Sequence, residues 1–327
     1  MMINYNIGIQ LTKNSEKYLR LISDLKTKKN VNCIHISNDE ILKENFSSLD
    51  ILVTHKMNDD LFSYASEKLK WIHFGSAGIE SSLFPALIKS KTIITNSSGI
   101  HSDSVSEFVV GTMLYFTKQF QECNKFYINR EWLQWDIARK MQNLKDKTVG
   151  IIGYGSIGKA IGIRAKAFGM KIIATRRLQK KIENKKTVDH LIPLSELEFL
   201  LKESDFIVVS CPLTPLTKGM IGKKELSKMK KTSYLINIAR GPIINENDLI
   251  EILKNKKISG AALDVFDKEP LSNQSQFFEL DNVLLSPHIS GNFPNYNEMV
   301  INLFNNNFDR FILGKALKNR VCKKRLY

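Results

Sequence analysis

Residues 147–158 read KTVGIIGYGSIG, a short apolar run that leads into three glycines with the spacing G-x-G-x-x-G. A helix-like stretch follows over residues 159–168, and a second apolar run occupies residues 171–175. A strand, a glycine turn, a helix and a second strand in this order predict a βαβ unit. The first run is uniformly apolar, which is typical of a parallel strand buried on both faces.

Each of the three glycines in this turn is needed for a different physical reason. Gly153 permits the tight turn, Gly155 lets the backbone approach a pyrophosphate, and Gly158 lets helix and strand pack closely. Ser156 and Ile157 lie between the glycines, where a helix N-terminus offers unpaired N–H groups and a partial positive charge to phosphates. The turn therefore predicts a dinucleotide-binding site.

The end of the second strand bears on which dinucleotide is bound. An NAD site usually places an acidic residue there, which accepts hydrogen bonds from the adenosine ribose. This chain has Thr175, Arg176 and Arg177 instead. Two guanidiniums and a hydroxyl suit a 2′-phosphate and leave an NAD ribose without its acceptor. We therefore expect a preference for NADP(H), with NAD(H) possible. The alternative interpretation is two solvated arginines at a strand end.

Three polar residues toward the C-terminal end suggest the chemistry. They are Arg240 in NIARG, Glu269 in DVFDKEP and His288 in SPHISG. A guanidinium can grip a carboxylate and polarise a carbonyl, an imidazole can deliver a proton near neutral pH, and a carboxylate can sustain the imidazolium charge. Together they predict reduction of the keto group of a small anion. Taken singly, they also fit a strand cap, a turn and a loop histidine.

The ordered set of motifs resembles the D-isomer-specific 2-hydroxyacid dehydrogenase family. The resemblance begins near residue 69, continues almost to the C-terminus and is strongest over residues 148–291. Its most specific stretches are LINIARGPIINE at residues 235–246 and GAALDVF at residues 260–266. In this family, hydride from a nicotinamide dinucleotide reduces a small 2-oxo acid, so the resemblance implies that reaction here.

The resemblance assigns catalytic roles to the polar trio. It implies that Arg240 binds the substrate, that His288 donates the proton and that Glu269 tunes this acid. The glutamate also argues against the formate dehydrogenase branch of the family.

Other site residues follow from the same resemblance. Backbone N–H groups of Ser76, Ala77 and Gly78, together with Arg240, are expected to hold the substrate carboxylate, and small residues let such a nest close onto an anion. An ordinary strand-to-helix turn is the alternative for this loop. The expected cofactor contacts outside the glycine turn and the second strand are Pro212, Thr217, Ile238, Ala239 and Asp264, the last orienting the nicotinamide amide. Alternatively, these residues have only a structural role, because prolines and threonines are common in loops and aspartates at strand ends.

The periodicity of the chain predicts its architecture. Apolar runs alternate with amphipathic stretches, which indicates an α/β fold with two parallel-sheet domains. We expect a Rossmann dinucleotide-binding domain inserted into a flavodoxin-like substrate domain. The predicted parts are residues 1–98 for the first part of the substrate (catalytic) domain, 99–290 for the NAD(P)-binding domain, and 291–327 for the return helix and tail of the substrate domain.

Individual elements can also be predicted. Five runs of the first domain indicate strands: Asn6–Leu11, Asn32–Ile36, Ile51–Thr54, Trp71–Phe74 and Thr92–Thr95. Two stretches between them indicate helices: Glu16–Lys26 and Ser81–Lys89. A long apolar helix is expected from Ser102, and the apolar pattern between Tyr296 and Phe308 predicts a helix that returns to the first domain. The basic end, residues 320–327, is expected to fray.

The composition fits a globular enzyme. Of 327 residues, 43% are hydrophobic and 25% charged, and the length favours two domains. No apolar run approaches the ~20 residues needed to span a bilayer, and the N-terminus lacks the pattern of a secretory signal. The four cysteines show no C-x-x-C spacing, so we expect reduced thiols in a cytoplasmic protein without a metal site.

The net charge of +15 favours a different class of function, because basic surfaces attract nucleic acids and anionic membranes. The lysines, however, are spread in small groups along the chain and form no aromatic-interleaved stripe. We therefore expect a solvated surface that draws in anionic substrates, and neither nucleic acid nor membrane as a partner.

Residues 127–135, YINREWLQW, are apolar and aromatic beside a polar stretch. The family resemblance suggests a homodimer arm or a segment that inserts near a neighbouring active site. A tryptophan pair buried within one subunit is the alternative.

These observations predict a reductase that converts a small 2-oxo acid, of the glyoxylate or hydroxypyruvate kind, into a D-2-hydroxy acid. NADPH is the expected hydride source, and the resemblance supplies the substrate class and the stereochemistry. A second function remains open, because relatives with this fold include dinucleotide-sensing corepressors that bind partners with little turnover.

Overall fold

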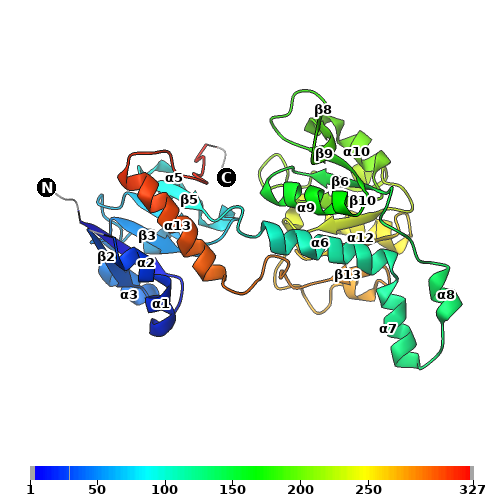
Figure 1. Cartoon of the computed structure of the whole chain (residues 1–327), viewed down its shortest axis with the longest axis horizontal. Helices are drawn as coiled ribbons and strands as arrows, with labels where there is room; N and C mark the ends of the chain where they lie inside the picture. Colours follow the sequence, from blue (N-terminus) through cyan, green and yellow to red (C-terminus); the bar gives the residue numbers. More distant parts are fainter. Residues whose placement is uncertain (1–3, 29, 325–327) are drawn as a thin grey trace. The chain divides into compact units, whose positions relative to one another are not determined.

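The computed structural model describes residues 4–28 and 30–324. These residues form two compact units (Figure 1). The first unit comprises the chain up to Ile100 together with the segment from Phe293 onward, and the second comprises His101–Asn292. Each crossing falls two residues beyond the boundary placed at residue 98 or 290 from the sequence.

The first unit is built on a five-stranded parallel sheet with the order β2-β1-β3-β4-β5. Its strands are β1 (Tyr5–Gln10), β2 (Val31–His35), β3 (Ile51–Thr54), β4 (Trp71–Phe74) and β5 (Ile93–Asn96). This is the strand order of flavodoxin-like sheets. β3 and β4 are buried along their whole length, and both are mainly apolar, with Thr54 and His73 as their buried polar residues.

Short helices cover this sheet. They are α1 (Ser15–Leu21), α2 (Ser23–Lys26), α3 (Asp39–Phe46), α4 (Asp59–Phe62), α5 (Pro85–Lys89) and α13 (Tyr296–Ile312), with a 3₁₀ turn, η1, at Glu80–Ser82. The single helix predicted over residues 16–26 is wrong, because the backbone leaves helical geometry at Ile22, where ψ is 5°. The helix predicted from Ser81 begins at Pro85 instead, since a proline holds the residue before it extended.

Two helices of the first unit, α3 and α4, were not predicted. Asn38 precedes α3 and accepts the N–H of Ile41 at 3.0 Å; Asn58 precedes α4 and accepts the N–H of Leu61 at 2.8 Å. Both caps are followed by two acidic residues in the first turn. A capping asparagine followed by acids is a helix-start signal that would have found both elements.

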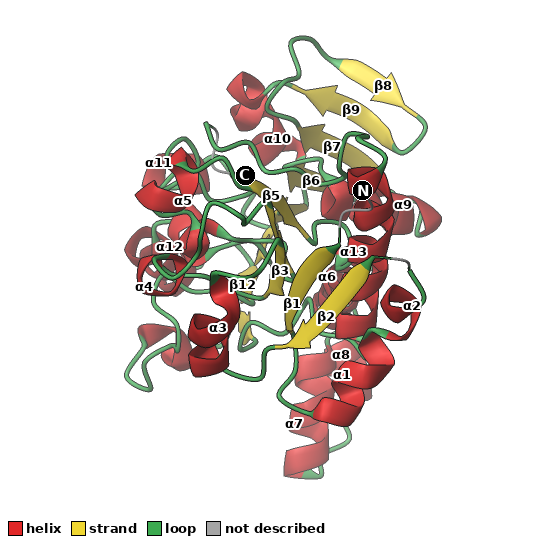
Figure 2. Ribbon diagram, turned by 90° about the vertical axis from the view of Figure 1, so that its left-hand side faces the viewer, coloured by secondary structure: helices red, strands yellow, loops and turns green. Residues whose placement is uncertain are grey.

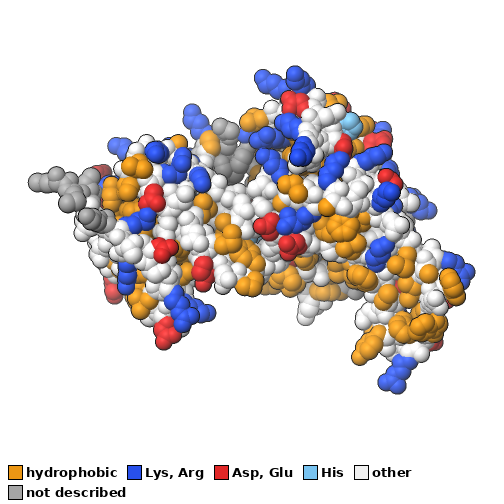
Figure 3. All heavy atoms as spheres, in the orientation of Figure 1, with side chains coloured by type: hydrophobic (Ala, Val, Ile, Leu, Met, Phe, Trp, Pro, Cys, Tyr) orange, Lys and Arg blue, Asp and Glu red, His pale blue; other side chains and the backbone are white. Residues whose placement is uncertain are grey.

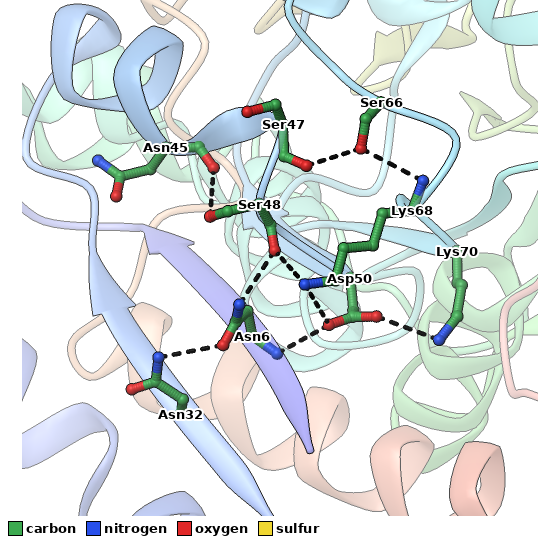
Figure 4. Close-up of polar contacts among 9 residues, drawn as sticks. All are labelled: Asn6, Asn32, Asn45, Ser47, Ser48, Asp50, Ser66, Lys68 and Lys70. Carbon is green, nitrogen blue, oxygen red and sulfur yellow. Dashed lines mark hydrogen bonds and ion pairs between the residues drawn. The ribbon is translucent and has the colours of Figure 1, made fainter. Parts of the chain in front are cut away.

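A polar cluster closes the amino-terminal edge of this sheet (Figure 4). Asp50 lies directly before β3, and its side chain is only 3% exposed. One carboxylate oxygen accepts the backbone N–H of Asn6 at 3.0 Å, and the other lies 3.1 Å from Lys70 Nζ. The cluster ties together the starts of three neighbouring strands. The opposite, carboxyl edge is where open α/β sheets bind ligands.

The return helix α13 completes the core of the first unit. Phe304 and Phe308 are at most 1% exposed and stand four residues apart on one helix face. Phe304 stacks on Trp71 of β4 with 4.9 Å between the ring centroids. The predicted return of the chain to the first sheet is therefore present.

The basic end was predicted to fray, and up to Lys324 this is wrong. Val321 donates its N–H to the carbonyl of Ile94 in β5 at 2.9 Å. Lys323 Nζ donates to the carbonyls of Leu87 and Ser90, at 3.0 and 2.8 Å, and so satisfies the C-terminal end of α5. The remaining predicted tail, residues 325–327, lies outside the described residues.

The second unit holds an eight-stranded sheet with the order β13-β12-β11-β10-β6-β7-β9-β8. Its strands are β6 (Thr148–Ile152), β7 (Lys171–Thr175), β8 (Glu183–Lys185), β9 (Val188–Ile192), β10 (Phe206–Val209), β11 (Tyr234–Asn237), β12 (Gly260–Leu263) and β13 (Val283–Leu285). All pairs are parallel except β8 with β9, an edge ribbon that was not predicted (Figure 2). The strand order reverses at β6, which is the switch point where such sheets bind dinucleotides.

Helices flank this second sheet. They are α6 (Ser102–Thr117), α7 (Phe120–Asn129), α8 (Gln134–Ala138), α9 (Ser156–Ala167), α10 (Leu197–Glu203), α11 (Lys223–Leu226) and α12 (Glu246–Lys254), with 3₁₀ turns at Leu194–Glu196, Gly241–Ile243 and Gln276–Glu279. α6 buries Val105, Val109 and Met113, which recur every four residues along one face. Within the described ranges, no helix combines the length and apolar character that a membrane crossing needs.

Candidate active site

The glycine turn after β6 is shaped by close approaches that only glycine allows. Gly153 has a φ of +104°, and a Cβ there would lie 2.7 Å from Cys211 Cα. A Cβ on Gly158 would lie 2.5 Å from the carbonyl oxygen of Gly153. Gly155 differs, because its Cβ position has no described atom within 4 Å beyond its chain neighbours. Gly155 caps α9, so this open space lies at a helix N-terminus and fits a pyrophosphate.

Thr175, Arg176 and Arg177, which the sequence grouped together at the end of β7, differ in exposure. Thr175 is 2% exposed, and its hydroxyl accepts the N–H of Gly153 at 3.2 Å. Its hydroxyl therefore stabilises the glycine turn from inside the fold. Arg176 and Arg177 are exposed directly after the strand. Of the three, the two arginines are the residues that this geometry presents to solvent.

The loop after β10 is organised by one hydroxyl. Thr217 Oγ1 donates to the carbonyl of Pro212 at 2.7 Å and accepts the N–H of Thr214 at 2.8 Å. Thr217 is 9% exposed, whereas Leu216 beside it is 75% exposed. Burial raises the pKa of the Cys211 thiol, at the start of this loop, to about 12, which excludes a thiolate nucleophile near neutral pH.

Arg240 follows β11 in a turn built by Asn237. The Asn237 side chain accepts the N–H of Ala239 and donates to the carbonyl of Arg240, both at 3.1 Å. Arg240 Nη1 donates to the carbonyl of Ala239 at 2.6 Å, which directs the guanidinium. Ala239 and the neighbouring Ile238 are 8% and 7% exposed. A Cβ on Gly241 would lie 1.9 Å from a backbone atom of Phe266, so the Arg240 turn and the loop after β12 are pressed together.

The predicted pairing of Glu269 with His288 is present. His288 Nδ1 lies 2.7 Å from Glu269 Oε2. The second carboxylate oxygen, Oε1, accepts the N–H of Phe266 at 3.0 Å, which fixes the orientation of the carboxylate. The two side chains are 48% and 36% exposed, so the pair is open to solvent on one side. Because Nδ1 is engaged, Nε2 is the nitrogen available for proton transfer.

Asp264 holds the loop on which His288 lies. Its carboxylate, in a residue 1% exposed, accepts Ser286 Oγ at 2.6 Å and the N–H groups of Ile289 and Ser290, both at 2.9 Å. His288 itself has a φ of +55°, a conformation that non-glycine residues adopt rarely. The nicotinamide contact expected for Asp264 stays a prediction, and the loop contacts were not foreseen.

The first turn of α6 anchors the same loop from its other side. Ser104 Oγ donates to the carbonyls of Ser290 and Asn292 at 2.9 and 3.0 Å, and His101 Nδ1 lies 3.0 Å from the carbonyl of Gly291. Burial lowers the pKa of His101, against the effect of its hydrogen bond to Gly291, and this favours a neutral ring. His101 and Ser104 were not predicted as site residues. The only sequence signal for them is that the apolar helix α6 begins with polar residues.

The loop after β4, in the first unit, presents a row of backbone donors. Within the described part of the chain, the N–H groups of Ser76, Ala77 and Gly78 have no hydrogen-bond acceptor. Consecutive amide groups without internal partners are what an anion-binding nest requires. The described residues contain no group of three or more His, Cys, Asp or Glu side chains able to hold a metal ion.

Comparison with known proteins agrees with this geometry. A family model described as D-isomer specific 2-hydroxyacid dehydrogenase, NAD binding domain, matches residues 110–290. A glyoxylate reductase from Thermococcus litoralis is 36% identical over 281 residues, which cover 84% of this chain and 83% of that protein. The chain belongs to the D-isomer-specific 2-hydroxyacid dehydrogenase family.

Solved structures confirm the fold. A D-isomer-specific 2-hydroxyacid dehydrogenase family protein from Aeromonas salmonicida superposes with a TM-score of 0.86 at 27% identity, covering 98% of this chain and 99% of that one. An NADPH-dependent glyoxylate/hydroxypyruvate reductase from Sinorhizobium meliloti, in complex with NADP and sulfate, gives 0.85 at 25% identity, covering 99% and 100%. This 2-hydroxyacid dehydrogenase is therefore an oxidoreductase that acts on a small molecule with a nicotinamide dinucleotide.

Proposed function

We propose that this dehydrogenase reduces a small 2-oxo acid, glyoxylate or hydroxypyruvate in kind, to the D-2-hydroxy acid. The observation that carries the proposal is the 2.7 Å pairing of His288 with Glu269. The two residues follow β13 and β12, and β12 lies next to β11, which precedes the Arg240 turn. The names of the Thermococcus and Sinorhizobium relatives support the substrate class. D stereochemistry rests on the family.

The dinucleotide, when bound, supplies the hydride. We assign its pyrophosphate to the turn from Gly153 to Gly158, where Ser156 and Ile157 present the first amides of α9. Pro212, Thr217, Ile238, Ala239 and Asp264 stay proposed contacts of the cofactor region. Of these, Thr217 and Asp264 also have defined roles inside the fold, in the Pro212–Thr217 loop and in the loop that carries His288.

Proton transfer falls to His288. Glu269 occupies its Nδ1, so Nε2 donates the proton to the carbonyl oxygen of the substrate. The carboxylate stabilises the charged imidazole before transfer, and its own hydrogen bond from Phe266 prevents it from turning away. Arg240 provides a fixed positive charge beside the developing alkoxide and a donor pair for the substrate carboxylate.

The first unit contributes carboxylate binding in this proposal. The N–H groups of Ser76, Ala77 and Gly78, which have no acceptor among the described residues, suit an anion and cannot distinguish one 2-oxo acid from another. A backbone nest of this kind gives affinity for the acid without restricting its side chain.

His288→Ala removes the proposed proton donor. We expect kcat for glyoxylate or hydroxypyruvate to fall about 10²–10⁴-fold, the usual contribution of general acid catalysis, with dinucleotide affinity unchanged. The rate is followed by the absorbance of the reduced nicotinamide at 340 nm. His190→Ala, which changes an exposed histidine of the same unit, is the matched control.

Full activity of His288→Ala across pH 6 to 8 would rule out the assigned role. Dinucleotide binding without turnover of any 2-oxo acid by the unaltered enzyme would instead favour the dinucleotide-sensing, corepressor-like function.

We further propose a preference for NADP(H) over NAD(H). Residues 176–182, directly after β7, include no acidic residue, and Arg176 and Arg177 are exposed where an adenosine 2′-phosphate would be recognised. The proposed preference rests on the two guanidiniums, because the hydroxyl of Thr175 is buried and accepts the N–H of Gly153. The Sinorhizobium relative, crystallised with NADP, supports the assignment.

The double variant Arg176→Ala, Arg177→Ala tests this preference. We expect the ratio of kcat/KM with NADPH to kcat/KM with NADH to fall about tenfold or more, because charge-assisted hydrogen bonds to the phosphate are lost. Lys171→Ala, at the exposed opposite end of β7, should leave the ratio unchanged. Equal efficiency of the unaltered enzyme with both cofactors would contradict the proposal.

We also propose a homodimer formed through the aromatic arm, residues 120–138, which contains α7 and α8. The arm projects from the body of the second unit, and hydrophobic side chains gather on it (Figures 1 and 3). Tyr127, Ile128, Trp132 and Trp135 are 79%, 65%, 78% and 67% exposed. The alternative of a tryptophan pair buried within one subunit is therefore wrong. An apolar patch of this kind marks a protein interface.

Replacing Trp132 and Trp135 together by serine should convert the dimer into a monomer, because aromatic anchors dominate interface energies. Sedimentation velocity at micromolar concentration measures the change. Leu178→Ser, at a site 70% exposed elsewhere on the same unit, should leave the dimer intact. A monomeric unaltered enzyme under these conditions would refute the arm as a dimer interface.

A further inference from the structure

The loop after β4 presents the N–H groups of Ser76, Ala77 and Gly78, which have no acceptor among the described residues. Each of the three carbonyl groups before them accepts a hydrogen bond from a different residue. The carbonyl of Gly75 accepts the hydroxyl of Tyr296, and that of Ser76 accepts the N–H of Ser97 at 3.1 Å. The carbonyl of Ala77 accepts Asn96 Nδ2 at 2.7 Å. Three consecutive peptide groups are thus each hydrogen-bonded through their carbonyl oxygen.

Holding a carbonyl also fixes the direction of the N–H in the same peptide group. A trans peptide is planar, and its N–H points opposite to its C=O. The peptide that bears the Ala77 carbonyl also bears the Gly78 N–H, so the Asn96 side chain sets where that N–H points. The same relation links Ser97 to the N–H of Ala77, and Tyr296 to the N–H of Ser76.

Asn96 is itself tightly constrained. It ends β5 and is 9% exposed. Its Oδ1 accepts the N–H of Ser98 at 3.2 Å, which leaves Nδ2 as the donor toward Ala77 and excludes the flipped amide. Its backbone N–H is also engaged, with the carbonyl of Asn319 at 3.2 Å. The donor therefore has a single available orientation.

A buried network behind the loop holds Ser97 in place. Thr95 Oγ1 accepts Trp71 Nε1 at 2.8 Å and lies 2.7 Å from His73 Nδ1, and His73 Nε2 lies 3.3 Å from Ser97 Oγ. Ser97 Oγ in turn donates to the carbonyl of Phe74 at 2.9 Å. Because Ser97 Oγ donates to Phe74, His73 Nε2 carries a proton; in a neutral ring, Nδ1 then accepts the hydroxyl of Thr95.

The network is neutral as well as rigid. His73 is fully buried, and this burial lowers its pKa to about 3. The imidazole is therefore uncharged at working pH and serves as a spacer between two hydroxyls. His73 therefore adds no positive charge behind the loop, and the backbone dipoles of the loop point in directions that depend on the carbonyl contacts.

We propose that Asn96 is a positioning residue for the substrate carboxylate: its side-chain amide aims the Gly78 N–H of the nest by holding the Ala77 carbonyl. The inference rests on the proposed function, since the carboxylate is that of the 2-oxo acid. Of the three carbonyl contacts, the one from Asn96 to Ala77 is the most readily tested. The Ser97 donor is backbone, and Tyr296 also stacks on His55, whereas Asn96 acts through a small side chain.

Two variants isolate this contact. Asn96→Ala removes both side-chain bonds, and Asn96→Asp keeps the shape and the acceptor for Ser98 but removes the donor. Asn307→Ala is the matched control, because Asn307 is also buried in the first unit and also makes two bonds to backbone, both with Lys318. Comparable melting temperatures of the variants and the control separate the loss of the contact from a loss of folding.

The kinetic test compares glyoxylate with its uncharged methyl ester. We expect both Asn96 variants to raise KM for glyoxylate about tenfold or more with kcat little changed, because a charge-assisted hydrogen bond to the anion is misdirected. KM for the ester should stay within about threefold, since no anion is bound there. An unchanged KM for glyoxylate in either folded variant overturns the inference.

Calorimetric titration with oxalate keeps the test independent of turnover. The unaltered enzyme and Asn307→Ala should bind this dianion, and the Asn96 variants should bind it at least about tenfold more weakly. If the unaltered enzyme binds oxalate but reduces no 2-oxo acid, the proposed function fails while the positioning role is still measured. Equal oxalate affinity in all forms, or no binding to the unaltered enzyme, overturns the inference.

Discussion

The buried carboxylate of Asp264 is the contact on which the arrangement of the second unit depends. It collects three donors from the loop after β13, and this loop places His288 within 2.7 Å of Glu269. A buried carboxylate is costly unless its lone pairs are satisfied, so the contact and the loop conformation require each other. The left-handed backbone of His288 persists because it is held from both sides, by Asp264 and by the first turn of α6, where Ser104 lies.

Both units use the same physical device at the carboxyl edges of their sheets. The groups to which we assign function lie on short loops whose backbone is held by buried polar side chains, Asp264 in one unit and Asn96 in the other. Thr175 and Asn237 do the same for the glycine turn and for the Arg240 turn. Such preorganisation means that little reorganisation is needed when charge develops in the transition state. The buried polar residues of this enzyme are therefore as informative as the exposed groups to which we assign catalysis.

The sequence predicted most of the sheet framework, because buried parallel strands are mainly apolar and the glycine turn has a characteristic spacing. β3 and β4 were predicted with their observed limits, as was β7. Elements defined by polar signals were missed or misplaced: the capped helices α3 and α4, the break at Ile22 and the β8–β9 ribbon. The Glu269–His288 pairing followed from motifs, although the two residues lie 19 positions apart in the sequence. The contacts of Asp264 and Asn96 span similar separations, 26 and 19 positions, but no motif marks them, because they depend on which backbone groups the fold brings beside each side chain.

Asp264→Asn tests the central claim most directly, through kcat and the dissociation constant of the reduced dinucleotide in one variant. The amide keeps the size of the side chain but places a donor against the donor N–H of Ser290 or Ile289. If Asp264 holds the loop of His288, kcat falls about tenfold or more, in addition to any loss of dinucleotide affinity from its proposed cofactor contact. A preserved kcat, whatever the dinucleotide affinity, would contradict the account.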